Sequence, residues 1–217
     1  MEPLLLQKLA DKKITKETLR NKVASNFDLL PDIFHGVYSP IAAVRYGCAS
    51  VLVDLSATYP EKLYPYMDEF VALLGGKHRI LTWNATAAIA NLCCVDNEKR
   101  FDLAFDKYFG LLNDEYLVTV ANVVGNAGKI ALAKPHLIAR ITAGLLRVED
   151  HPTTPHLTEE CKRVLCEATL DSFSLFFSML DPNDRLEVLA FARRCLNSPR
   201  KTLFAKAELF LRQWSRV

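Results

Sequence analysis

Helix-breaking residues divide this chain into apolar segments of similar length, and this regular division restricts its fold more than any other feature. After Pro60, for example, Leu63, Met67 and Phe70 fall on one helical stripe before Gly75. No stretch alternates with period two over a useful length, so we expect helices and no strands. The 217 residues are 50% hydrophobic and include only 8 glycines, which favours one sizeable helical core over glycine-rich β or nucleotide-binding folds.

Prolines and capping residues predict where individual helices begin. Ser39-Pro40, Asp181-Pro182 and Ser198-Pro199 each place a capping side chain before a first-turn proline, and Thr158 is a further cap. Residues 149–156 form the one long loop. We expect helices at 40–58, 60–74, 78–95, 97–112, 115–133, 135–148, after Thr158, 183–197 and 200–215.

Four segments end in a similar apolar signature. Their last leucines, Leu74, Leu112, Leu146 and Leu180, are 38, 34 and 34 residues apart. That period holds two helices with their turns, which is a helical-repeat spacing. One such pair cannot bury its apolar faces alone, so neighbouring pairs must stack.

Local motifs resemble known helical repeats. The segment 42–45 (Ala-Ala-Val-Arg) opening a helix, Leu52-x-x-Leu55 and a proline at the turn between pairs resemble HEAT repeats, and 84–92 (Asn-Ala-Thr-Ala-Ala-Ile-Ala-Asn-Leu) resembles an armadillo repeat. The resemblance covers about residues 39–148. It implies an all-α, right-handed α-α superhelix of about five helical pairs, as a single domain over 1–217 with a less regular helical segment at about 1–38. Unrelated functions share these motifs, so they predict a fold and no activity.

A polar position recurs in the second helix of successive pairs. Aligning the repeats puts Asp54, Asn91 and Asn126 in one register, which would form a row on the concave surface. In armadillo proteins such asparagines hold an extended peptide, because an amide both donates and accepts. Those proteins commonly carry a Trp one turn before the Asn, where this chain has Ala87 and Asn122. The alternative is that these polar groups bond neighbouring helices and hold the repeats in register.

The inner-helix residues are therefore the candidates for partner binding. They are Arg45, Asp54, Arg79, Trp83, Asn84, Asn91, Asn122 and Asn126. We expect a non-enzymatic scaffold that binds another protein or a peptide segment on its concave face, with apolar and Asn contacts for affinity and rim charges for specificity. The sequence predicts no oligomeric state.

Nucleic-acid binding is the alternative function. HEAT-like proteins of this length include DNA glycosylases that excise alkylated bases, and such chemistry needs an acidic residue beside aromatics in a basic groove. Residues 181–217 contain eight Lys or Arg against four acids, but the net charge is only +2 and neither tryptophan lies in a Trp-Asp cluster. Protein binding is therefore favoured.

No motif predicts catalysis, a cofactor or a metal. The sequence has no GxSxG, GxxxxGK or GxGxxG. His151 and His156, followed by Cys161 and Cys166, lack the paired spacing of a zinc site. We interpret the acidic positions Glu98, Asp102 and Asp106 as a solvated helix face.

The amino-terminal residues and the cysteines predict a compartment. Residues 1–8 start with an acid at position 2 and a three-leucine run, unlike a signal peptide, and no apolar run is long enough to span a membrane. We therefore expect a cytoplasmic (intracellular) protein without membrane contact, whose six cysteines are reduced, mostly buried thiols.

Overall fold

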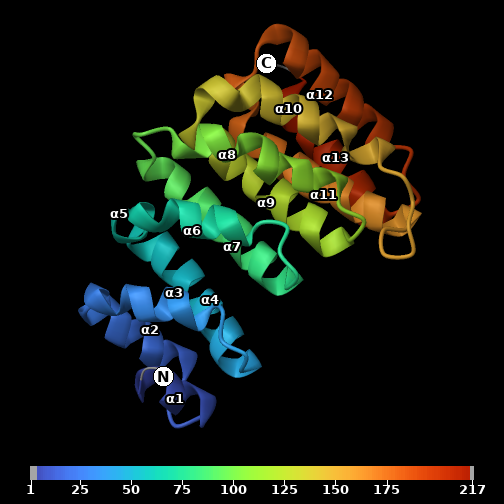
Figure 1. The fold of residues 1–217 in the computed structure, drawn as a ribbon. Helices are drawn as coiled ribbons and strands as arrows, with labels where there is room; N and C mark the ends of the chain where they lie inside the picture. The colour runs from blue at the N-terminus through green and yellow to red at the C-terminus, as the bar shows by residue number, and fades with distance from the viewer. Residues whose placement is uncertain (1–3, 216–217) are drawn as a thin grey trace. The chain divides into compact units, whose positions relative to one another are not determined.

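The chain is all-α in the computed structural model, which describes residues 4–215 (Figure 1). Within these residues, β pairing is limited to an isolated bridge between Thr154 and Leu157. The chain forms two compact units, unit 1 up to Ala104 and unit 2 from Phe105. The single domain over 1–217 stays a prediction, and its first three and last two residues lie outside the described range. No helix within 4–215 combines the length and apolar character that crossing a membrane requires.

Unit 1 is built around two long helices that pack on each other, α4 and α7. Shorter helices cover this pair, and the segment before residue 38 is a set of short helices, as expected. The helices are α1 (Leu4–Ala10), α2 (Lys16–Ser25), α3 (Leu30–Gly36), α4 (Ala42–Thr58), α5 (Pro60–Leu63), α6 (Met67–Leu73) and α7 (Arg79–Leu92), followed by α8 (Arg100–Phe109) at the boundary between the units.

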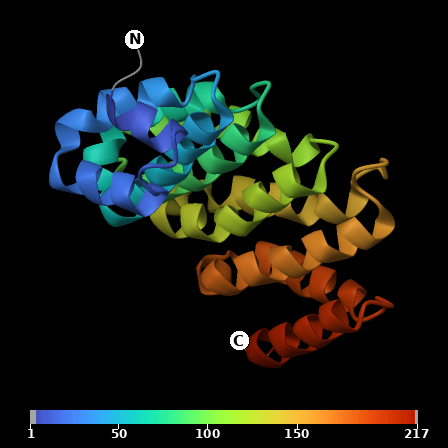
Figure 2. The same cartoon turned by 90° about the horizontal axis from the view of Figure 1, so that it is seen from below.

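Unit 2 repeats this plan. Its long helices α9, α11 and α13 pack in sequence, and α10 and α12 lie side by side as a covering pair (Figures 1 and 2). The helices are α9 (Leu117–Ala133), α10 (Ile138–Leu146), α11 (Glu159–Phe176), α12 (Pro182–Cys195) and α13 (Lys201–Trp214). We call α4 and α7 the long-helix layer of unit 1, and α9, α11 and α13 the long-helix layer of unit 2.

The repeat period is longer than the leucine signature predicted. The long helices begin at residues 42, 79, 117, 159 and 201. Leu74, Leu112 and Leu146 each lie at or near the end of a covering helix or the 3-10 turn after it, as expected, whereas Leu180 follows the long helix α11. The last 34-residue spacing is therefore not a repeat period, and its interpretation as one was wrong. The loop after Asp150 lengthens the connection into α11.

The predicted helix starts are largely confirmed. Pro60 is the first residue of α5, and the Asp181 carboxylate accepts from the backbone N–H groups of Asn183 and Asp184 ahead of α12. The Thr158 hydroxyl caps α11. These side chains satisfy N–H groups that the first helical turn leaves without partners.

Two expectations about proline were wrong in detail. The helix predicted over 60–74 is interrupted by a 3-10 turn at Tyr64–Tyr66, where Pro65 has no N–H to donate. At the Ser-Pro sites, α4 and α13 begin two residues after the proline. The Ser39 hydroxyl accepts from Ile41 N and the Ser198 hydroxyl from Arg200 N, both at 3.2 Å, so each serine closes a turn ahead of the helix.

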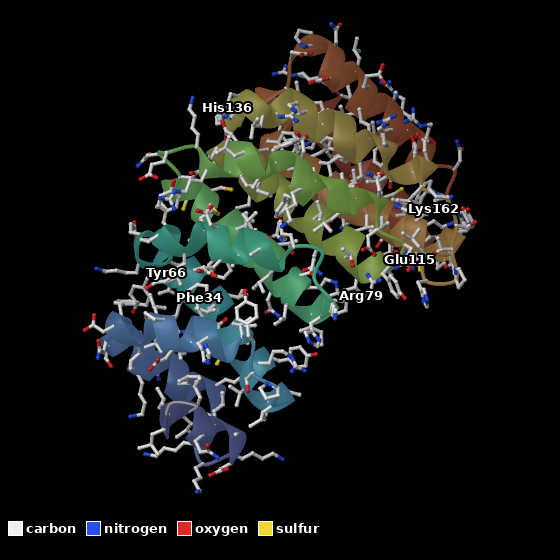
Figure 3. All side chains as sticks on the ribbon, in the orientation of Figure 1. Phe34, Tyr66, Arg79, Glu115, His136 and Lys162 are labelled. Carbon is white, nitrogen blue, oxygen red and sulfur yellow. The ribbon has the colours of Figure 1, made fainter. Side chains whose placement is uncertain are left out.

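Aromatic side chains join the covering helices to their neighbours. In unit 1 the ring of Phe34 on α3 stacks on Tyr66 with centroids 4.5 Å apart (Figure 3). In unit 2, Phe173 on α11 meets Phe191 on α12, and both are fully buried. Burying one such side chain contributes about 2–3 kcal/mol, so these contacts stabilise each unit substantially.

The long helices α9 and α11 approach each other closely at Gly128. A Cβ atom added there would lie 2.7 Å from the Leu175 Cδ1 atom and 2.9 Å from the Ser172 carbonyl oxygen. The Ser172 hydroxyl in turn donates to the Val124 carbonyl oxygen on α9. Glycine is thus required at this point by the distance between two backbones.

A buried carboxylate fixes the start of α8. Asp96 is 5% exposed and accepts from the backbone N–H groups of Arg100 and Phe101 at 2.8 and 3.0 Å. The Tyr64 hydroxyl donates to the same carboxylate at 2.7 Å. Burial, followed by this hydrogen bond and the negative charges nearby, raises the pKa of Tyr64 to about 12.

Gly128→Ala tests the close approach. We expect a net loss of about 1–2 kcal/mol in unfolding free energy, because overpacking exceeds the helix-propensity gain of about 1 kcal/mol. Gly125→Ala, three residues earlier on the same helix, is the matched control: its Cβ would meet nothing within 4 Å, so it should stabilise by about 0.5–1 kcal/mol. Urea denaturation measures both, and equal effects of the two substitutions would contradict the packing.

Tyr64→Phe tests the buried cap through its pH dependence. The variant should lose about 1 kcal/mol at neutral pH with the Asp96 bond. Because the folded pKa lies above the unfolded value near 10, this advantage of wild type is complete below pH 10 and lost as pH rises through about 12. Denaturant midpoints of both proteins across this range measure the difference. A difference that does not change with pH would contradict the assignment.

Candidate partner-binding surfaces

Asn91 joins the two long helices of unit 1. Its Nδ2 atom on α7 donates to the Ser56 hydroxyl on α4 at 2.9 Å, and that hydroxyl donates to the Val53 carbonyl oxygen at 2.7 Å. Ser56 is fully buried. This geometry matches the alternative in which the polar position holds neighbouring repeats in register.

Asp54 lies two residues before Ser56 on α4 and is exposed. It belongs with Asn91 to unit 1, whereas Asn126 belongs to unit 2. The row of all three residues, and its role in holding a peptide, therefore stay predictions.

Three asparagines bond back onto their own helices. Asn84, Asn122 and Asn126 each donate Nδ2 to the carbonyl oxygen four residues earlier, at 2.7, 2.8 and 2.8 Å. Each bond fixes the orientation of the amide while its oxygen keeps the capacity to accept. In unit 2, Asn122 and Asn126 lie one turn apart on α9, so the structure brings these two candidates together.

Arg45 supports the turn that precedes α4. Its guanidinium donates to the Ser39 carbonyl oxygen at 2.8 Å, and its central carbon lies 4.7 Å from the centre of the Tyr46 ring. Arg79 (Figure 3) and Trp83 are half-buried on α7, and each makes contacts within the protein. A partner-binding role of these residues stays a prediction.

An exposed apolar surface on the long-helix layer of unit 2 was not predicted from the sequence. Val118 and Leu132 on α9 are 44% and 48% exposed, and Leu175 on α11 is 54% exposed. The same layer carries Met179 just after α11, and Phe204 and Leu209 on α13. The seven-residue spacing of Val118, Gly125 and Leu132 marks one helix face. The sequence contained that signal, but spacing alone does not tell a buried face from an exposed one.

A hollow of about 650 Å³ lies between the end of α8 and α10 in unit 2. Arg140 bonds Asp106 at 2.6 Å and lies 4.0 Å over the Phe105 ring. His151 Nε2 lies 2.9 Å from the Leu112 carbonyl oxygen. Arg140 and Asp106 thus bind each other and His151 binds a backbone carbonyl oxygen, and these groups include no nucleophile paired with a base.

Several other histidines and cysteines have local partners. His156 stacks on Tyr116 with ring centroids 4.1 Å apart. Cys166 and Cys195 are buried free thiols, and their mutual hydrogen bond together with burial raises the pKa of Cys166, which favours an inert thiol. Cys94 is exposed, and its thiol donates to the Asn91 carbonyl oxygen at 3.1 Å. Within residues 4–215, no three His, Cys, Asp or Glu side chains gather as metal ligands.

The basic residues near the C-terminus largely pair with acids. Arg200 on the approach to α13 bonds both Glu160 and Glu167 on α11, and Lys206 bonds Asp171. Burial would raise the pKa of Glu167, but hydrogen bonds from Arg200 and Thr202 outweigh it and lower that pKa. Arg194 pairs with Glu149 and Arg212 with Glu208. Arg216, the last of the eight, lies outside the described residues. These pairs reduce the free positive charge for a phosphate backbone.

No family model matches the chain, and no curated protein sequence matches it. Solved structures do. A designed armadillo repeat protein is 18% identical with a TM-score of 0.62, over 95% of this chain and 89% of its own. An engineered protein from the Northeast Structural Genomics Consortium is 13% identical with a TM-score of 0.57, over 97% of this chain and 87% of its own. At these identities the likeness concerns the fold alone: the chain has an all-α helical-repeat fold of the armadillo/HEAT kind.

Proposed function

We propose that this chain is a non-enzymatic protein-interaction scaffold that binds a partner protein on the long-helix layer of unit 2. The exposed apolar surface of that layer carries the proposal. Of the seven large hydrophobic side chains exposed in the described part of unit 2, six lie on α9, on α13, or on α11 with the turn after it. A concentration of exposed large apolar side chains on one layer of helices favours protein binding.

The polar groups of this surface suit a protein partner. Asn122 and Asn126 follow Val118 on α9. One N–H of each amide is bonded within the helix, and each amide oxygen can accept from a peptide N–H. Apolar contacts would supply most of the affinity and the amides the orientation. The helical-repeat fold is consistent with this use.

Nucleic-acid binding, including glycosylase-like activity, has less support. The C-terminal cations largely pair with carboxylates, as in the contacts of Arg200 and Lys206 with α11. The net charge of +2 adds little attraction for a polyanion. We therefore retain protein binding as the proposed function.

Site-specific photocrosslinking tests the proposed surface. p-Benzoylphenylalanine is introduced in place of Leu175, and separately in place of Leu186 on the covering helix α12 as a control of similar exposure, 54% and 64%. After irradiation in the native cell, we expect a discrete protein adduct from position 175 and none from position 186. Adding Leu132→Glu to the Leu175 probe should abolish the adduct, because it puts a charge on the same apolar surface.

Equal adducts from the two positions, or none from position 175, would contradict the proposal. Thermal melts of each variant establish that it is folded. An adduct that survives Leu132→Glu would show that Leu132 is not part of the surface that the partner contacts.

A further inference from the structure

The long helices α4 and α7 of unit 1 begin at the same edge (Figure 1), and two hollows lie beside that edge. The first, of about 400 Å³, lies between the loop after α1 and the start of α4. Its cations are Lys12 and Lys16, and Tyr46 forms part of its wall. Both lysines are exposed, and the stem of Lys16 lies against Gly47.

The second hollow, of about 200 Å³, lies between the end of α3 and the loop before α7. Arg45, Lys77 and His78 line it. Tyr46 joins it to the first hollow: the Arg45 guanidinium carbon lies 4.7 Å from the Tyr46 ring centre, and the His78 ring meets the same ring edge-on at 6.4 Å. We call Lys12, Lys16, Arg45, Tyr46, Lys77 and His78 the basic edge of unit 1.

The charge of this edge is one-sided. Four cations and a histidine line the two hollows, and neither lining includes a carboxylate. Asp11, near the first hollow, is bonded to Lys13 at 2.9 Å. The charge of Glu69 reaches Tyr38 in the lining of the second hollow, since burial and then this charge raise the pKa of Tyr38. In a chain with 27 basic and 25 acidic residues, this local excess of positive charge favours an anionic partner.

The walls of both hollows are aliphatic, so charge alone does not describe the surface. Leu9 and Ile14 line the first hollow, and Leu73 and Leu81 line the second. The surrounding surface exposes Tyr38, Ile41 and Ile80, at 60%, 40% and 40%. A matching ligand needs apolar side chains to enter the hollows and negative charges beside them.

We propose that the basic edge of unit 1 binds an acidic peptide segment in which aliphatic or aromatic side chains alternate with Asp or Glu. The apolar side chains enter the two hollows, while the carboxylates face Lys16, Arg45 and Lys77. A nucleic acid supplies the negative charge but no aliphatic side chains for these walls, so the peptide fits both features. This surface lies in unit 1 and does not depend on the binding surface proposed for unit 2.

A synthetic probe tests the proposal without a known partner. Fluorescence anisotropy is measured for a labelled peptide of repeated Glu-Glu-Leu triplets at low salt, with the full chain. Peptides of Gln-Gln-Leu and Glu-Glu-Ser triplets, and a single-stranded oligonucleotide of matching length, are compared. We expect the Glu-Glu-Leu peptide to bind most tightly, with affinity falling as salt rises.

The variant Lys16→Glu with Lys77→Glu should weaken binding of this peptide by about tenfold or more, because two attractions become repulsions. Lys22→Glu with Lys201→Glu is the matched control: both residues are exposed, lie outside the two linings and change the net charge equally. It should change affinity by less than about twofold.

Any of four results would overturn the proposal. They are no binding of the Glu-Glu-Leu peptide, equal binding of either substituted peptide, tighter binding of the oligonucleotide, or equal weakening by the two double variants. Circular dichroism melts establish that the variants are folded. If Lys16→Glu with Lys77→Glu does not fold, Lys77→Glu alone must still weaken binding by about threefold or more.

Discussion

The close approach of consecutive long helices is the constraint on which the rest of each unit depends. In unit 2, α9 and α11 are near enough that Gly128 has no room for a Cβ, and the Ser172 hydroxyl reaches a carbonyl oxygen of α9. In unit 1, Asn91 bonds Ser56 across α7 and α4. Because such contacts form only in one register, they determine which side chains of each long helix are covered and which remain exposed.

This constraint gives the two units surfaces of different chemistry. In unit 2, this packing leaves large apolar side chains of α9 and α11 exposed, among them Leu132 and Leu175. In unit 1, the start of α4 carries Arg45 and lies near Lys12, Lys16 and Lys77. Aliphatic side chains line the two hollows beside it. The two proposals therefore give the protein two dissimilar partner segments. The two proposals rest on separate observations, so a test that contradicts one does not affect the other.

Local signals predicted much of the fold, and contacts between distant residues account for what they did not predict. The cap at Asp181 and the start at Pro60 depend on neighbouring residues alone, so the sequence located them. Pro65 was overlooked inside an apolar stripe, although its missing N–H interrupts the helix. The bond between Asn91 and Ser56 spans 35 residues, and the basic edge collects Lys16 and Lys77 from separate segments. No spacing rule identifies such pairs before the fold is known.

A double-mutant cycle on Asn91→Ala and Ser56→Ala tests most directly the claim that polar side chains hold the long helices in register. Unfolding free energies of wild type, both single variants and the double variant give the coupling between the two side chains. The account predicts a favourable coupling of about 1 kcal/mol, the contribution of a hydrogen bond between helices that are otherwise unchanged. If the effects of the two single substitutions add to within about 0.3–0.5 kcal/mol, the account is contradicted. Asn91 would then again be a candidate for partner binding.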